Sequence, residues 1–138
     1  MDTPVSPPVT IDTLVSAWNS HDPARLAACY TQDAVFEEVP LGHPVRGQAA
    51  LLAMFTALFN AFPDLVMTAG NRAQQADCLA WEWIITATHR GEFNGIPATG
   101  NAVQLRGASF CSLRGGKIAE NREYWDLNTV LRQIGVSS

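Results

Sequence analysis

An asparagine, a glutamate and a tryptophan occupy alternate positions near the C-terminal end of the chain, at Asn121, Glu123 and Trp125. The turn sequence Arg-Gly-Gly-Lys at 114–117 precedes them, and the residues between are typical of a β-strand. Because strand side chains alternate faces, these three share one face with Ala119. The other face has Ile118, Glu120, Arg122, Tyr124 and Asp126. A carboxylate and an amide among apolar groups suit general acid–base catalysis in a cavity. The alternative is a half-exposed strand whose charges meet water.

Three further polar residues are candidates to act with Glu123. Asn121 can hydrogen-bond a substrate or an oxyanion, or it can be satisfied within its own strand. Ser109 lies opposite Glu123 if the Gly-Gly hairpin contains a β-bulge; otherwise it is a core serine bonded to backbone. His43, in a loop rich in Pro and Gly, is a candidate for the rim of a substrate pocket.

Aromatic residues are the candidates for the walls of that pocket. Trp81 and Trp83 recur at alternate positions of the strand expected at 78–89. The other predicted substrate-binding aromatics are Trp18, Phe36, Phe59 and Trp125. Aromatic residues at such spacing are more often plain core. These aromatic residues can belong to the core or to the wall of a pocket, and both alternatives stay open.

The composition is that of a soluble globular protein of one domain, with 138 residues, 47% hydrophobic and 16% charged. The net charge is −4, and the nine Lys and Arg are scattered, which argues against nucleic acid and anionic membranes as partners. No segment has the pattern of a signal peptide or a membrane span. Three widely spaced cysteines favour reduced thiols and a cytoplasmic location. The three histidines lack the spacing of a zinc site, so no metal is expected.

Hydrophobic periodicity predicts the elements that position these residues. After a loose Pro-rich arm at 1–8, helices are expected at 9–19, 24–30 and 48–62, and a short one at 127–134. Asp22 and Pro23 read as the cap and first residue of the second helix. Strands are expected at 34–39, 65–74, 78–89, 102–113 and 117–125.

Helices first and antiparallel strands after them indicate one α+β domain at 9–138. The long helix at 48–62 has a wide apolar stripe and must cover one face of a curved antiparallel sheet. A sheet that curls around a helix forms a cone, whose open end is a ready pocket.

The order of elements resembles the nuclear-transport-factor-2-like, or ketosteroid-isomerase-like, α+β cone. Four segments resemble the SnoaL-like polyketide cyclases within that superfamily, which include the nogalonic acid and aklanonic acid methyl ester cyclases. They are Thr-His-Arg-Gly-Glu-Phe-Asn-Gly-Ile-Pro-Ala-Thr-Gly at 88–100, Gly-Lys-Ile at 116–118, Asn-Arg-Glu at 121–123 and Leu-Arg-Gln-Ile-Gly at 131–135. The resemblance covers residues 9–135 and is more specific for the fold than for the activity, because this fold hosts many activities.

The resemblance implies an intramolecular aldol cyclisation without metal or cofactor. Aligned on Gly-Lys-Ile, the family's catalytic aspartate falls on Glu123, whose side chain is one methylene longer. The family's assisting histidine falls on Ser109, a glutamine on Gly107 and a substrate-contacting asparagine on Phe36. The loss of these polar groups favours a smaller or more apolar substrate.

We therefore expect a cofactor-independent cyclase or isomerase of a small, enolisable, largely apolar or polyketide-like molecule. Its catalytic residues would be Glu123, Asn121 and Ser109, and relatives of this kind are commonly homodimers through the open face of the sheet. One alternative is a non-catalytic protein that binds a small molecule. Another is a hydrolase resembling the epoxide hydrolases of this superfamily, which needs an Asp-Arg-Asp constellation. Burial of Glu123 beside a second polar group favours the enzyme, whereas an arginine partner or exposure to solvent favours the binding protein.

Overall fold

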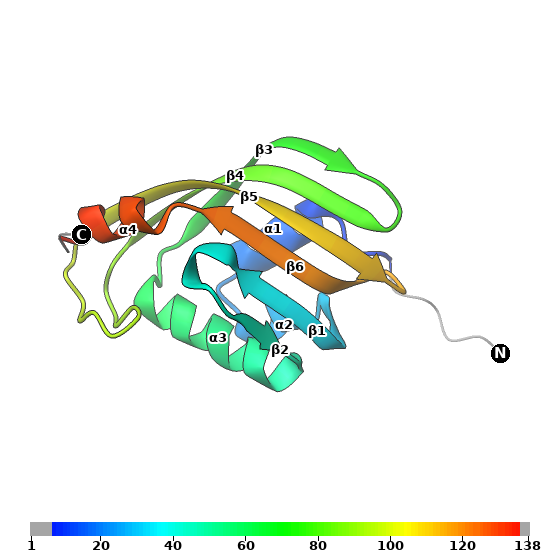
Figure 1. The fold of residues 1–138 in the computed structure, drawn as a ribbon, viewed down its shortest axis with the longest axis horizontal. Helices are drawn as coiled ribbons and strands as arrows, with labels where there is room; N and C mark the ends of the chain where they lie inside the picture. The colour runs from blue at the N-terminus through cyan, green and yellow to red at the C-terminus, as the bar shows by residue number, and fades with distance from the viewer. Residues whose placement is uncertain (1–6, 136–138) are drawn as a thin grey trace.

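A curved sheet of six strands forms the frame of the molecule in the computed structural model, which describes residues 7–135 (Figure 1). In the order in which they pair across the sheet, the strands are β2 (Pro44–Arg46), β1 (Tyr30–Glu38), β6 (Lys117–Trp125), β5 (Ala102–Arg114), β4 (Cys78–Thr88) and β3 (Val66–Gln74). The expected α+β class is confirmed. The sheet is not purely antiparallel, however, because β1 pairs with β6 in parallel. A long stretch of chain separates these two strands, and parallel pairing requires such a long connection in place of a hairpin.

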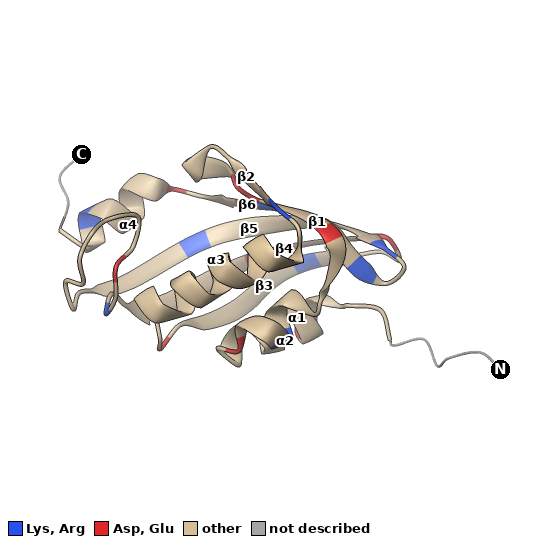
Figure 2. Ribbon diagram, turned by 90° about the horizontal axis from the view of Figure 1, so that it is seen from below, with Lys and Arg blue, Asp and Glu red and all other residues tan. Residues whose placement is uncertain are grey.

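Three helices lie on one face of the sheet: α1 (Ile11–Asn19), α2 (Pro23–Ala27) and the long α3 (Gln48–Ala61) (Figures 1 and 2). The short α4 (Leu127–Gln133) lies beside β5, where the side chain of Gln133 bonds both backbone groups of Gln104. A 3₁₀ turn, η1 (Val39–Leu41), joins β1 to β2. The opposite face of the sheet has no helix over it in the part of the chain that the structure describes. None of the described helices is long and apolar enough to cross a membrane.

The second helix is shorter than its sequence pattern predicts. Asp22 caps it as expected, with its carboxylate accepting from the N–H groups of Ala24 and Arg25. The helix ends at Ala27, however, and Tyr30 begins β1 instead of closing an apolar stripe. Its backbone is in register with Ile118 of β6, and its hydroxyl bonds Asn121. Tertiary pairing therefore overrides the local helical pattern at this residue.

Phe55 of α3 lies at the centre of the hydrophobic core. Its ring centroid lies 5.6 Å from that of Trp18 and 5.7 Å from those of Tyr30 and Phe36. The contact with Trp18 is edge-to-face, the geometry that aromatic quadrupoles prefer. The helix thus covers the sheet through one aromatic cluster.

The hairpin between β5 and β6 contains the bulge on which the placement of Ser109 depended. Ser112 is in register with Glu120 and Leu113 with Ile118, so Ala119 has no partner on β5. Simple alternation placed Ile118 and Glu123 on opposite faces of the sheet. The extra residue puts both side chains on the inner face, where both are buried. With this register, Ser109 lies directly opposite Glu123.

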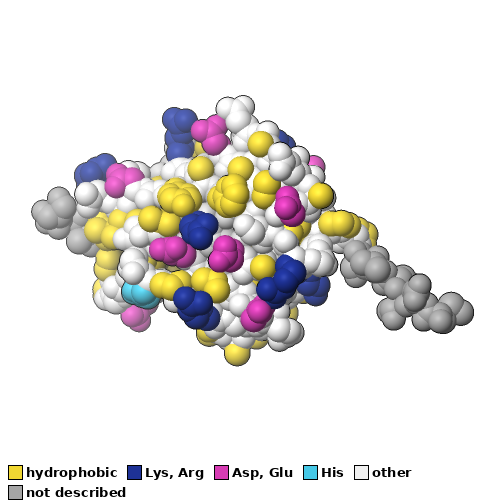
Figure 3. Space-filling model, turned by 45° about the vertical axis from the view of Figure 1, so that its right-hand side comes forward, with side chains coloured by type: hydrophobic (Ala, Val, Ile, Leu, Met, Phe, Trp, Pro, Cys, Tyr) yellow, Lys and Arg dark blue, Asp and Glu magenta, His cyan; other side chains and the backbone are white. Residues whose placement is uncertain are grey.

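Charged side chains of both signs are interspersed with hydrophobic ones on the side of the molecule drawn in Figure 3, with no extended basic patch there. Residues 1–6 of the expected N-terminal arm lie outside the described residues. Further along, the N–H of Val9 donates to the carbonyl of Gly116 at 2.8 Å, which ties the start of the domain to the β5–β6 hairpin.

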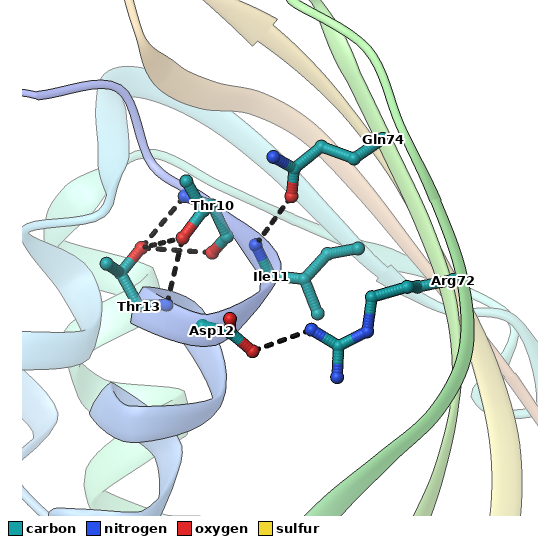
Figure 4. Close-up of polar contacts among 6 residues, drawn as sticks. All are labelled: Thr10, Ile11, Asp12, Thr13, Arg72 and Gln74. Carbon is teal, nitrogen blue, oxygen red and sulfur yellow. Dashed lines mark hydrogen bonds and ion pairs between the residues drawn. The ribbon is translucent and has the colours of Figure 1, made fainter.

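The N-terminus of α1 is joined to β3 by polar contacts (Figure 4). Thr10 and Thr13 form a reciprocal capping box, and the N–H of Ile11 donates to the side-chain oxygen of Gln74 at 3.2 Å. Asp12 forms an ion pair with Arg72 at 2.6 Å. These contacts fix the helix that places Trp18 over the inner face of the sheet.

Candidate active site

An apolar pocket opens on the inner face of the sheet, between the strands and the helices. It has about 600 Å³ of free space, its open mouth included. Apart from two glutamates its lining side chains are aromatic or aliphatic: Trp18, Leu58, Phe62, Leu65, Met67, Trp83, Ile85, Ala87, Phe93, Val103, Leu105, Trp125 and Val130. The two acidic residues are Glu38 and Glu123. A largely apolar concave site with a few polar groups is the usual form of a small-molecule site.

Glu123 is only 3% exposed and accepts hydrogen bonds at both carboxylate oxygens. The hydroxyl of Ser109 donates to Oε2, and Asn121 Nδ2 donates to Oε1 at 3.3 Å. A second buried donor stands behind each of these partners. Trp83 Nε1 donates to Ser109 Oγ at 2.8 Å, and the Tyr30 hydroxyl donates to Asn121 Oδ1 at 2.7 Å. The three predicted catalytic residues therefore form one buried, connected network.

A missing side chain at Gly107 makes room for Trp83 in this network. Trp83 and Gly107 are in register on β4 and β5, so a side chain at 107 would point to the same face as the indole. A Cβ at Gly107 would lie 2.3 Å from Cη2 of Trp83, inside any permitted contact distance. The indole consequently lies across β5 and reaches Ser109, two residues along that strand.

Glu38 is a site residue that the sequence analysis missed. It is the last residue of β1, where it is in register with Glu123 on the parallel neighbour β6. Trp125 Nε1 donates to its carboxylate Oε2. A signal was available, because Ala34, Phe36 and Glu38 alternate along the strand and the first two are completely buried. That alternation places Glu38 on the inner face.

Removal from water raises the pKa values of both carboxyls. The pKa of Glu123 is raised from its ordinary 4.5 to about 8, chiefly by burial and then by the charge of Glu38, against the lowering effect of hydrogen bonds from Ser109, Asn121 and Trp83. Burial raises the pKa of Glu38 to about 7, against the hydrogen bond from Trp125. With pKa values of about 7 and about 8, the two groups together carry about one proton between those pH values. The site then has both a carboxylic acid and a carboxylate, the two groups that acid–base catalysis needs.

The predicted pocket aromatics divide into two groups. Trp18, Trp83 and Trp125 line the pocket, whereas Trp81, Phe36 and Phe59 are buried in the core outside its lining. His43 is exposed between η1 and β2 and does not line the pocket. The fully buried His89 forms a hydrogen bond with Thr99 at 2.9 Å.

The described ion pairs all involve surface side chains and leave the two pocket glutamates free of arginine. Arg122, beside Glu123 in sequence, points away and lies 3.9 Å from Glu37 and 3.7 Å from Glu120. Among residues 7–135, no group of three His, Cys, Asp or Glu residues is arranged to hold a metal ion. The described lining also has no Lys or Arg that would pair with an anionic cofactor.

Comparisons with known proteins agree with this architecture. The sequence profile described as SnoaL-like polyketide cyclase matches residues 9–134. Among solved structures, IdmH from Streptomyces antibioticus, a candidate polyketide cyclase, is 29% identical, with a TM-score of 0.74 over 91% of this chain and 96% of its own. AclR from Streptomyces galilaeus, a candidate hydroxylase, is 26% identical, with a TM-score of 0.76 over 89% of this chain and 90% of its own.

A third structure shows the fold alone. This SnoaL-like candidate cyclase from Jannaschia sp. CCS1 is 21% identical, with a TM-score of 0.80 over 99% of this chain and 100% of its own. A search of curated proteins gave no significant match.

Proposed function

Since the chain belongs to the SnoaL-like polyketide cyclase family, we propose that it is a cofactor-independent cyclase or isomerase of a small, enolisable, largely apolar molecule. Glu123 is the general acid–base residue. The observation that supports this role is a carboxyl group buried at the wall of an apolar pocket and held by donors on both oxygens. A carboxyl in such a place has its pKa raised toward neutrality, where a general base is most effective.

The chemistry is a proton transfer followed by ring closure. A carboxylate of the pair takes a proton from the carbon next to a substrate carbonyl, which gives an enol or enolate. That carbon then bonds to a second carbonyl carbon of the same molecule, and the oxygen of the second carbonyl takes a proton. Atoms and charge balance without an oxidant or a reductant, and an isomerase uses the first step alone, with the proton returned elsewhere.

Glu38 supplies the second carboxyl of this reaction. The proton that the pair shares near neutral pH lets one group donate to a substrate oxygen while the other accepts from carbon. The rate should therefore pass through a maximum between pH values of about 7 and about 8, the pKa values of the pair, and fall on both sides.

The pocket selects for uncharged substrates. Its described lining has two acidic groups and no basic one. A substrate with its own carboxylate would place like charges together in a poorly hydrated cavity, which costs free energy. The same lining lacks the Asp and Arg that the epoxide-hydrolase-like alternative needs.

We also propose that the protein acts in the cytoplasm, which its widely spaced cysteines favour, as a homodimer joined through the outer face of the sheet. A non-catalytic binding protein is the competing outcome of the test below.

The test uses 2-tetralone, a compact apolar ketone, and follows exchange of its α-hydrogens in D₂O by proton NMR. The protein should accelerate exchange, and Glu123→Gln should lose about 10²–10⁴-fold of that acceleration. Glu82→Gln is the matched control, because Glu82 lies exposed on the opposite face of β4 and should retain full exchange. Binding of 2-tetralone with no acceleration, or equal rates for Glu123→Gln and the unaltered protein, would leave the binding protein as the function.

A further inference from the structure

We propose that Trp83 is a positioning residue that acts on Glu123 through Ser109, and that Gly107 is the residue that permits it. The inference rests on the proposed function and deepens the role of Glu123 as the acid–base residue. It assigns to the indole the task of committing the serine hydroxyl to the carboxylate form of Glu123.

The directions of the hydrogen bonds support this assignment. An indole N–H can only donate, so Trp83 Nε1 occupies a lone pair of Ser109 Oγ, at 2.8 Å. The proton of the serine hydroxyl then cannot point at the indole, and its bonded acceptor is Glu123 Oε2. Without the indole, the hydroxyl could turn and accept from a protonated Glu123 instead. The indole therefore favours the ionised carboxylate, which accepts and does not donate.

The burial of the three residues makes this bias strong. Ser109 is 3% exposed and Trp83 4%, so water cannot easily replace either bond. A hydrogen bond to a charged group away from water is worth more than one at the surface. Since Trp83 lies over Gly107, with no room for a Cβ beneath it, the contact depends on a glycine at that position of β5.

Asn121 forms an independent second arm on the other carboxylate oxygen. The Tyr30 hydroxyl donates to Asn121 Oδ1, which turns the amide nitrogen toward Glu123. The titratable groups near Glu123 are Glu38 and Tyr30 from β1 and Cys111 from β5. The helices contribute only Trp18, Leu58 and Val130 to the pocket lining, and none of these titrates.

The experiment titrates Glu123 directly and needs no substrate. Protein labelled with ¹³C at the carboxyl carbon of glutamate is followed by NMR from pH 4 to pH 10, in a Glu38→Gln background so that Glu123 titrates without its coupled partner. Loss of a signal in Glu123→Gln assigns the resonance. Trp83→Phe retains a ring over Gly107 and removes the N–H, so the midpoint of Glu123 should rise by about one pH unit.

Trp81→Phe is the matched control. Trp81 lies two residues away on the same face of β4, is buried, and its Nε1 has no hydrogen-bond partner among the described residues. Its replacement should leave the midpoint within about 0.2 units, because only the indole at 83 donates into the network. An equal rise in both variants would mean that loss of packing, and not the Trp83 N–H, controls the titration, and would overturn the proposal.

A double-mutant cycle separates the relay from a merely structural effect. Ser109→Ala should itself raise the midpoint. Adding Trp83→Phe to it should produce a smaller rise than Trp83→Phe alone, because the indole then has no hydroxyl to orient and keeps only its direct effect on the carboxyl. Additive shifts would contradict the proposal. Because no turnover is measured, this titration tests the relay separately from the proposed function. The relay can fail while 2-tetralone exchange still depends on Glu123, and the relay can hold while the protein shows no exchange activity.

Discussion

At the scale of single residues, the site is defined by two carboxyl groups facing one poorly hydrated pocket. Glu38 and Glu123 are in register on adjacent strands, which lie about 4.8 Å apart. A hydrogen-bond donor holds each carboxyl group in place: Ser109 for Glu123 and Trp125 for Glu38. The protein accepts the free-energy cost of burying them, which is typical of functional sites.

Glu123→Gln should weaken the fall of stability with rising pH. The folded pKa of Glu123, about 8, lies above the ordinary value of 4.5, so its contribution to stability is fully present below about pH 4.5. That contribution is lost as pH rises through about 8, because the fold must then hold a buried charge. The variant should lose less stability between pH 5 and pH 9, and at pH 9 should exceed the unaltered protein by about 1–3 kcal/mol.

Guanidinium unfolding curves at several pH values measure this effect. Glu82→Gln, at an exposed glutamate, should keep the slope of the unaltered protein. A Glu123→Gln protein whose stability falls with pH as steeply as the unaltered protein would show that this carboxyl is already ionised in the fold at neutral pH.

At the scale of elements, α1 shows how a helix end positions a pocket residue. Its capping box and the bond from Ile11 to Gln74 fix its start against β3 (Figure 4), and Asn19 bonds the N–H and carbonyl of Met67 at its end. The ion pair of Asp12 with Arg72 contributes little, because both side chains are exposed to solvent, at 83% and 41%. Backbone capping therefore does more than surface charge to keep Trp18 in place.

Thr10→Ala should destabilise the protein by about 1 kcal/mol, because the N–H of Thr13 loses its side-chain acceptor. Thr10→Ser retains the hydroxyl and should lose much less. Thermal unfolding of the two variants under the same conditions measures the difference. Equal melting temperatures for the alanine and serine variants would mean that the cap does not contribute to stability.

At the scale of the whole molecule, no helix of residues 7–135 covers the outer face of the sheet. Large apolar side chains from four consecutive strands are exposed there: Val66 at 49%, Ile84 at 40%, Phe110 at 40% and Tyr124 at 47%. Glu82, Arg106 and Arg122 stand among them on the same face. An apolar surface with charges of both signs suits a self-complementary contact between two copies.

We predict a homodimer through this face. Sedimentation velocity at micromolar concentrations should give a dimer for the unaltered protein and a monomer for Tyr124→Glu. Leu52→Glu is the control, because Leu52 is 41% exposed on α3 and should leave the dimer intact. A monomeric unaltered protein would refute the predicted assembly without affecting the pocket chemistry.

Local sequence patterns were enough to predict the fold class, the long helix and the faces of β4. The alternation of Leu79, Trp81, Trp83 and Ala87 gave the inner face of β4, because side-chain direction depends only on the backbone period. The sequence placed Ser109 opposite Glu123 on the condition that the hairpin contains a bulge, and the structure contains it. These features involve residues close together in the chain, where geometry leaves few alternatives.

Tertiary structure decided which of these residues meet. Trp81 and Trp83 have the same pattern, yet only Trp83 lines the pocket, because Gly107 makes room for its ring. Glu38 reaches Glu123 through the parallel pairing of β1 with β6, and its bond from Trp125 joins residues 87 positions apart. Periodicity gives the direction of a side chain within one strand, but a contact between distant strands depends on their pairing in the folded sheet.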